Sequence, residues 1–214
     1  ETLPTSIVLG GLAMLFAVLV AFPAGLCAAY FRNSFIDRVC MSIAALGISL
    51  PNFVLGALLI WAVALQLGWL QIGRWDDWSS VILPMITLGA APTAFLASLL
   101  RSTLIETMNE DFVRTARAKG LKESMVIVKH ALLHSLIPVL TVLGPLAAAL
   151  LTGSFVVEFV FAIPGMGRFF ITAVTDRDYP LIMGVTLVYT ALLVCANLVV
   201  DLLYSFVDPR IRVE

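Results

Sequence analysis

Charged side chains are scarce in this sequence. Only 13% of its 214 residues are Asp, Glu, Lys or Arg, whereas about a quarter of the residues of an ordinary soluble domain are charged. Hydrophobic residues make up 61% of the chain, and the mean hydropathy is +1.03. This composition excludes a soluble globule with one large core and indicates a polytopic membrane protein in a lipid bilayer. The net charge of −1 does not point to nucleic acid, and we expect no nucleic-acid partner.

Patterns for nucleotide and metal binding are also missing. No Gly-x-x-x-x-Gly-Lys-Ser/Thr phosphate loop occurs, so the chain cannot hydrolyse ATP by that route. We therefore expect no catalytic residue and no cofactor bound by this chain. His130 and His134 are one helical turn apart, a spacing that can hold a metal. With no acidic or Cys partner nearby, we expect no metal site. The cysteines, which lack the spacing of pairs or ligands, are expected to be small buried side chains: Cys27, Cys40 and Cys195.

Five segments are apolar and long enough to cross a bilayer, which takes about 20 helical residues. They predict an all-α fold, a polytopic transmembrane helical bundle, as one domain over residues 1–214. Prolines inside the second, third and fourth segments are expected to kink the helices. The segments are 7–31, 39–67, 81–100, 136–161 and 181–207.

Basic residues are distributed unevenly between the connections. Ten of the thirteen Lys and Arg residues fall on one side of the five spans, and three fall on the other. Because cytoplasmic loops carry the excess of Lys and Arg, we expect the long connection and the C-terminus to be cytoplasmic. The start of the chain then lies outside. We expect a further span before Glu1, which would place both ends on one side.

The connection between the third and fourth spans carries the most informative pattern. Residues 106–119 can form a helix of about four turns, with its acids early and its bases late, as the helix dipole favours. Gly120 suits a left-handed C-cap, and residues 122–133 indicate a second short helix. Small side chains at Ala116 and Ala118 would let another protein approach the backbone. The alternative is a helical hairpin lying on lipid headgroups.

Three stretches in this order resemble one family. Residues 112–121, Phe-Val-Arg-Thr-Ala-Arg-Ala-Lys-Gly-Leu, are similar to the signature loop of ABC importer permeases, in the form of the dipeptide/oligopeptide/nickel permease family. Residues 161–168, Phe-Ala-Ile-Pro-Gly-Met-Gly-Arg, followed by 176–180, and the tail 208–212, Asp-Pro-Arg-Ile-Arg, also resemble it. One feature departs from the broader signature, because residues 129–132 stand where that signature has Ile-x-Leu-Pro.

The resemblance implies a transmembrane subunit of an ATP-driven importer in a bacterial or archaeal cytoplasmic membrane, and no enzyme. It implies a second, homologous permease subunit, two cytoplasmic ATPase subunits that bind ATP and Mg, and an extracytoplasmic substrate-binding protein as partners. The implied cargo is di- or oligopeptides, with nickel or another small solute as the alternative. The connection 106–134 becomes a coupling loop that inserts into an ATPase, through Arg114, Thr115, Ala116, Arg117, Ala118, Lys119, Gly120 and Leu121.

The stretch after the fourth span combines proline and glycine. We expect a short helix or re-entrant hairpin at the outer mouth of the pathway, acting as a gate or docking ledge; a tight interfacial turn is the alternative. The acids and the base at 176–178 can pair with one another or with a docking protein. Trp69, Trp75 and Trp78 fit a membrane-interface belt or a partner-docking patch. The external residues concerned are Pro164, Gly165, Gly167, Arg168, Asp176, Arg177 and Asp178.

Polar residues within the spans are candidates for lining a pathway, although each can equally bond a neighbouring helix. Glu158 and Asp201 lie near span ends, within snorkelling distance of an interface, so we expect structural roles at least as much as transport roles. No span carries a charge near its centre, which disfavours a gradient-driven secondary transporter or channel. A membrane scaffold that recruits a cytoplasmic enzyme is the third alternative. The pathway candidates are Asn52, Thr87, Thr93, Thr141 and Thr152.

Overall fold

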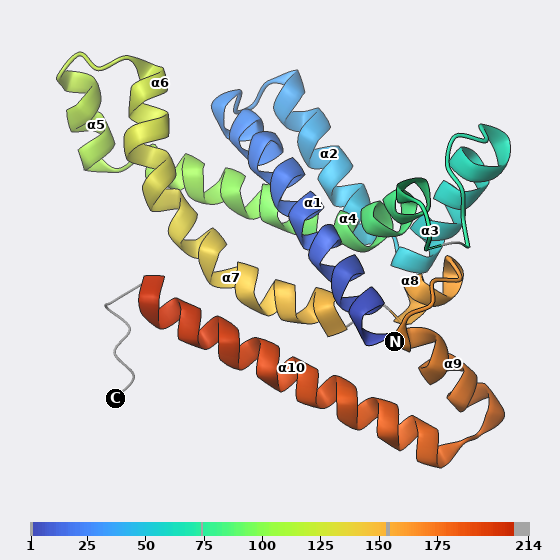
Figure 1. Cartoon of the computed structure of the whole chain (residues 1–214). Coiled ribbons are helices and arrows are strands. Elements are labelled where there is room, and N and C mark those ends of the chain that lie inside the picture. The colour runs from blue at the N-terminus through green and yellow to red at the C-terminus, as the bar shows by residue number, and fades with distance from the viewer. Residues whose placement is uncertain (1, 74, 153–154, 208–214) are drawn as a thin grey trace. The chain divides into compact units, whose positions relative to one another are not determined.

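The computed structural model describes residues 2–73, 75–152 and 155–207, and the side chains in these ranges except those of 152 and 200–207. Every regular element in these ranges is helical (Figure 1). The order is α1 (Leu3–Tyr30), α2 (Phe35–Ser49), α3 (Asn52–Leu59), the π-helical η1 (Ile60–Gln66), α4 (Trp78–Thr107), α5 (Asp111–Ala118), α6 (Glu123–Met125), the π-helical η2 (Val126–Ala131), α7 (Leu132–Thr152), α8 (Phe155–Val160), α9 (Met166–Asp176) and α10 (Tyr179–Val207).

The helices confirm the predicted class. Four stretches in the described part of the chain are long and apolar enough to cross a membrane: Leu3–Tyr30, Trp78–Thr107, Glu123–Leu151 and Tyr179–Val199. A fifth results if α2 and the α3–η1 stretch count as one broken span. The all-α bundle with four or five spans was therefore predictable from apolar run lengths alone.

The second span has the interruption at Pro51 that its proline predicted, whereas the predicted boundaries of the fourth span were wrong. The second is interrupted before Pro51, whose extended backbone (ψ 138°) separates α2 from α3, because a proline disfavours helical geometry in the residue before it. No separate short helix occupies 122–133, since α6, η2 and α7 run on from Glu123 to Thr152. The fourth span therefore begins earlier than predicted and ends before α8.

The helix predicted over 106–119 is also divided differently. Helix α4 continues to Thr107, and α5 begins only at Asp111. Leu104, which is fully buried, gives the last turn of α4 its packing, so tertiary contacts override the charge pattern that suggested a start at Glu106. Among the cysteines, Cys27 and Cys195 are exposed rather than buried, because an apolar run on a membrane helix does not distinguish an inward face from an outward one.

The chain divides into two compact units, and α1, α4 and α7 contribute residues to both. The first unit comprises residues 1–16, 50–90 and 144–214. Its core is made by the start of α1, the first half of α4 and the α7–α8 region, and it is formed by Leu9, Ala13, Leu83, Leu88, Leu150, Val157, Phe161 and Ile163.

Glycines set the close helix approaches in the first unit. A Cβ on Gly10 would lie 2.6 Å from the carbonyl oxygen of Leu150, and one on Gly89 would lie 2.9 Å from that of Ala13. Both neighbours are backbone atoms, which cannot swing away. The packing of α1 against α7 and α4 therefore requires glycine at these positions, because a side chain of any size would collide with the neighbouring backbone.

The second unit comprises residues 17–49 and 91–143. A buried ion pair ties the start of α2 to α4: Arg101 Nε and Nη2 donate to the two carboxylate oxygens of Asp37 at 2.6 and 2.7 Å. The amide of Asn33, a residue with left-handed φ of 63°, donates to the same carboxylate at 2.9 Å. Asp37 is 3% exposed, so this ion pair holds α2 against α4 within the unit.

Replacing Asp37 with asparagine should destabilise the second unit. The change leaves the guanidinium of Arg101 without its charged partner. Breaking a fully buried pair costs about 3–5 kcal/mol; because the Arg101 side chain is 25% exposed, we expect about 1–3 kcal/mol. Thermal unfolding in detergent measures the loss, and Asp76→Asn, an exposed acid in the other unit, is the control. Equal unfolding temperatures for the two variants would show that the Asp37–Arg101 ion pair does not stabilise the second unit.

Candidate functional site

Helix α5 presents two distinct faces within the second unit. Val113 and Ala116, three residues apart on one side, are 0% and 6% exposed. They pack with Leu104, Val126 and Ala131 in a small apolar core between the end of α4, α5 and η2. The short helix is thus anchored on α4 and η2, and its opposite face is left on the surface.

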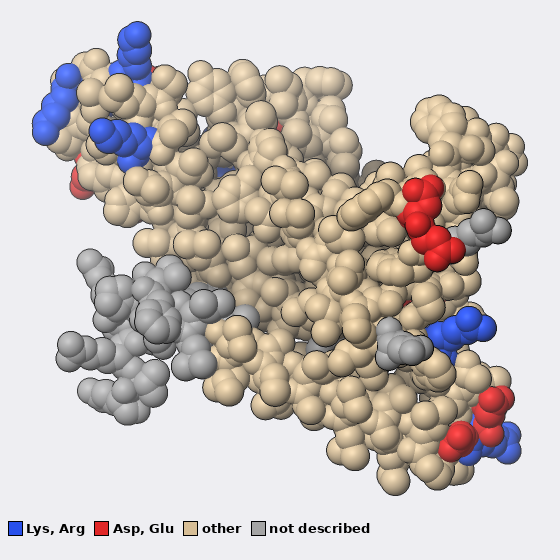
Figure 2. All heavy atoms as spheres, viewed as in Figure 1, with Lys and Arg blue, Asp and Glu red and all other residues tan. Residues whose placement is uncertain are grey.

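The outer face of this loop is basic. Figure 2 shows Lys and Arg side chains gathered over α5 and α6. Arg114, Thr115, Ala118 and Lys119 are exposed. The ion pair of Arg114 with Asp111, 3.5 Å apart, is itself exposed and contributes at most about 1 kcal/mol. These side chains are therefore available to another surface.

Arg117 closes the loop on itself. Its Nη2 donates to Glu123 Oε1 at 2.6 Å, and its Nη1 donates to the carbonyl oxygen of Met108 at 3.3 Å. The hydrogen bond to the Glu123 carboxylate raises the pKa of Arg117 further above its usual range. One side chain thus links the turn before α5 to the start of α6. The ring of Phe112 lies 4.7 Å from that of His134, which adds a second link.

The turn after α5 requires a left-handed residue. Gly120 has φ of +78°, and its amide donates to the carbonyl oxygen of Arg117 at 2.9 Å. A Cβ added there would meet no atom of the described chain within 4 Å. The space beside Gly120 is open, so the glycine serves the backbone conformation and leaves room for a contact from outside.

The small residues predicted to admit a partner separate into two groups. Ala118 and Gly120 are exposed, as a docking surface needs. Ala116 is buried in the core under α5, so its small size serves internal packing and not a partner. Leu121 also packs against that core. The coupling role of the outer group stays a prediction.

A helix follows the Pro-Gly motif in the first unit. Helix α9 follows Pro164 and lies between α8 and α10 along the chain (Figure 1). Pro164 and Arg168 are exposed, whereas Gly165 and Gly167 are buried. Within the described residues, the side chains at 176–178 form no ion pair with one another. Instead, Asp178 Oδ1 accepts the amide of Leu181 at 3.1 Å, and Arg177 ends α9 in a left-handed conformation.

Glu158 is fully buried instead of reaching an interface. Its carboxylate accepts the amide of Gly167 at 2.6 Å. Asp201 has no described side chain. Sequence reasoning missed Ser6 and Asp37, both buried and both bonded to partners far along the chain. No local pattern marks either residue, because each partner lies at least 64 positions away.

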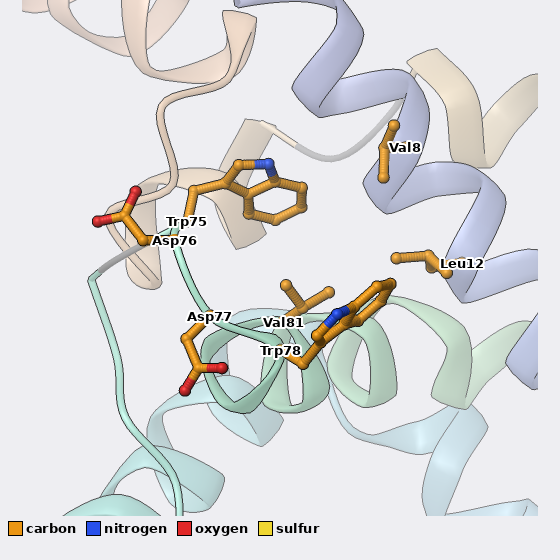
Figure 3. Close-up of a pocket in the computed structure, with 7 residues that line it drawn as sticks. All are labelled: Val8, Leu12, Trp75, Asp76, Asp77, Trp78 and Val81. Carbon is orange, nitrogen blue, oxygen red and sulfur yellow. The ribbon is translucent and has the colours of Figure 1, made fainter.

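Two of the three tryptophans, Trp75 and Trp78, border a pocket of about 180 Å³ in the first unit. Its wall is formed by residues just before α4, by Trp78 and Val81 at the start of α4, and by Val8 and Leu12 of α1. In Figure 3 the indoles of Trp75 and Trp78 face the pocket, whereas the carboxylates of Asp76 and Asp77 point away from it. Trp75 also packs on the unit's core, while Trp78 is 74% exposed.

The proposed pathway residues have different surroundings. Thr87 is fully buried, and its hydroxyl donates to the carbonyl oxygen of Leu83 at 2.8 Å. Thr141 is exposed and donates to Ile137 in the same way. Asn52 and Thr93 are half-buried, and the side chain of Thr152 lies outside the described set. Whether they line a pathway stays a prediction.

Comparison with known proteins adds an independent finding. The family described as "Binding-protein-dependent transport system inner membrane component" matches residues 21–213. The dipeptide transport system permease protein of Bacillus subtilis (strain 168) is 46% identical over 211 residues, which are 99% of this chain and 68% of that protein. The oligopeptide transport system permease protein of Haemophilus influenzae is 42% identical, over 98% of this chain and 69% of that protein.

A third relative extends the range of named substrates. The glutathione transport system permease protein of Escherichia coli (strain K12) is 45% identical over 94% of this chain and 65% of its own length. The chain therefore spans about two thirds of these relatives.

Solved structures confirm the fold. A chain of the methionine ABC transporter in an inward-facing conformation superposes with a TM-score of 0.77 at 16% identity, covering 97% of this chain and 94% of that one. A chain of an amino acid ABC transporter gives 0.74 at 19% identity, covering 92% and 88%.

Proposed function

We propose a function on the basis that the chain belongs to the family of binding-protein-dependent transport system inner membrane components. The chain forms half of the translocation pathway of an ATP-driven importer for di- or oligopeptides. The α4–α7 connection carries this proposal: a short helix, anchored on one face, that ends in an open left-handed glycine and exposes basic residues. Such a rigid projection transmits a push from a docked ATPase to the spanning helices.

The partners follow from this arrangement. A second, homologous permease completes the pathway, two cytoplasmic ATPase subunits bind ATP and Mg, and an extracytoplasmic binding protein delivers the substrate. The α5 loop and the C-terminus face the cytoplasm, in keeping with the Lys and Arg excess on that side. The motion of the coupling loops alternates access to a central cavity.

Peptides are the favoured cargo. The three relatives described above are named for dipeptides, oligopeptides and glutathione, and glutathione is itself a peptide. Nickel and other small solutes remain alternatives, and the binding protein is expected to set most of the selectivity.

Purification of the full-length protein in mild detergent, with mass spectrometry of bound proteins, tests the assembly. An ATPase with a phosphate loop should co-purify with the wild type and be lost with Ala118→Trp, which enlarges an exposed position of α5. Thr172→Trp, on the exposed side of α9, is the control and should retain the ATPase.

Reconstitution of the purified complex in liposomes tests the activity. Uptake of a labelled dipeptide should require ATP inside, and a nickel signal under the same conditions would change the assigned cargo. A chain that purifies alone and moves solute under an ion gradient would overturn the proposal in favour of a secondary transporter.

A further inference from the structure

Helix α9 begins without a cap of its own. Its N-cap residue is Gly165, which has no side chain to accept the free amides of the first turn. Two residues from other helices accept them instead. Ser6 Oγ of α1 accepts the amide of Met166 at 3.0 Å, and Glu158 Oε2 of α8 accepts the amide of Gly167 at 2.6 Å. We call Ser6 and Glu158 the amide clamp; both belong to the first unit.

The clamp is buried and includes a carboxylate. Ser6 is 2% exposed and Glu158 is 0% exposed. The carboxylate faces the positive end of the α9 dipole, and a hydrogen bond from an amide to an ionised acceptor is stronger than a neutral one. The hydroxyl of Tyr189 on α10 is buried as well, and the ring of Tyr189 lies against that of Phe155 of α8 at 4.4 Å. The environment is therefore organised around one carboxylate.

The two glycines of the Pro-Gly-Met-Gly motif make room for the clamp. A Cβ on Gly165 would overlap the Glu158 carboxylate, and one on Gly167 would lie 2.5 Å from the backbone Cα of Phe155. The ring of Phe155 stacks on that of Phe170 of α9 at 5.0 Å. The motif thus lets the end of α9 sit directly on α8, where the clamp can reach its amides.

We propose that the amide clamp positions α9 for the transport cycle by holding its N-terminal end on α1 and α8, and that α9 can move only when both hydrogen bonds open. This inference rests on the proposed function, in which α9 is an external gate element. Ser6 and Glu158 are positioning residues in this role, since they act through α9. The amide of Gly167 has a carboxylate as its acceptor and the amide of Met166 has a neutral hydroxyl. The hydrogen bond to Glu158 is therefore the stronger of the two.

Hydrogen exchange of the purified full-length complex in lipid nanodiscs tests the clamp directly. The peptide covering residues 164–170 reports the two amides. Glu158→Gln keeps the shape of the side chain and removes its charge, and Ser6→Ala removes the other acceptor. We expect exchange in this peptide to rise about tenfold in Glu158→Gln, because a neutral amide oxygen replaces the carboxylate as the acceptor and weakens a charge-assisted hydrogen bond, and to rise less in Ser6→Ala. Thr172→Ala, an exposed change on the same helix, should exchange like the wild type.

Peptide uptake by the same preparations separates the possible results. With the clamp as proposed, uptake falls several-fold in Glu158→Gln while the co-purified ATPase stays bound and Thr172→Ala transports normally. Unchanged exchange in both clamp variants would show that Ser6 and Glu158 do not hold the amides of α9. Raised exchange with normal uptake overturns its role in transport and leaves a local cap. Absence of ATP-driven uptake in the wild type and Thr172→Ala would instead refute the proposed function.

Discussion

Gly10→Ala is expected to destabilise the protein, whereas the same change at the adjacent Gly11 is not. Both glycines lie within α1, where alanine gains about 0.5–1 kcal/mol over glycine from helix propensity alone. A Cβ at Gly10 meets the backbone of Leu150 at 2.6 Å, but a Cβ at Gly11 meets nothing within 4 Å. Overpacking against backbone typically costs about 1–3 kcal/mol, so the two variants should shift stability in opposite directions.

Thermal unfolding of the two variants in the same detergent measures this difference. Because propensity is equal at the two positions, the gap between their unfolding temperatures isolates the close approach of α1 to α7. Equal shifts, or a more stable Gly10→Ala variant, would show that α1 and α7 are further apart than the structure implies, in which the added Cβ would lie 2.6 Å from the carbonyl oxygen of Leu150. The result bears on function, because these helices frame the first unit.

Gly120→Val is expected to uncouple ATP hydrolysis from uptake. Gly120 has φ of +78°, a conformation that costs an ordinary side chain about 1–2 kcal/mol, and a β-branched residue would distort the turn and fill the open space beside it. We expect uptake per ATP hydrolysed to fall about tenfold or more, equivalent to ~1.4 kcal/mol or more of lost coupling. Uptake and hydrolysis are measured together in liposomes that contain the whole complex.

Gly120→Asn is the matched control for this prediction. Asparagine tolerates left-handed geometry better than other side chains, so this variant should keep the unfolding temperature of the wild type while still adding bulk at the surface. Reduced uptake in both variants means that a partner approaches the glycine closely. Wild-type uptake in Gly120→Asn would mean that the turn alone matters, and normal uptake in Gly120→Val would remove the loop from the coupling mechanism.

The sequence allowed the bundle and the position of the basic loop to be predicted, because both depend on signals that are local in the chain. Apolar run length identifies a spanning helix, and a left-handed turn is marked by its glycine, as at Gly120. The boundaries were less predictable. Helix α4 runs on to Thr107 because Leu104 packs there with residues of α1, α5 and η2, a contact that no local pattern reveals.

The buried polar contacts could not be predicted for the same reason. Glu158 looked interfacial because it follows an apolar run, yet its carboxylate is enclosed and bonded to the first turn of α9. Ser6 and Asp37 gave no signal, since their partners Met166 and Arg101 are distant in sequence. Ala116 looked suited to docking by its size, and only its burial assigns it to the core.

The central claim is that the exposed face of α5 docks an ATPase subunit. Photo-crosslinking in membranes tests it most directly, with the reactive amino acid placed at Thr115, on the exposed face of α5, and at Thr172 on α9 as the control. The account predicts an adduct between position 115 and a protein that bears a phosphate loop, and no such adduct from position 172. Adducts of position 115 with lipid alone, or with the same ATPase from both positions, would contradict it.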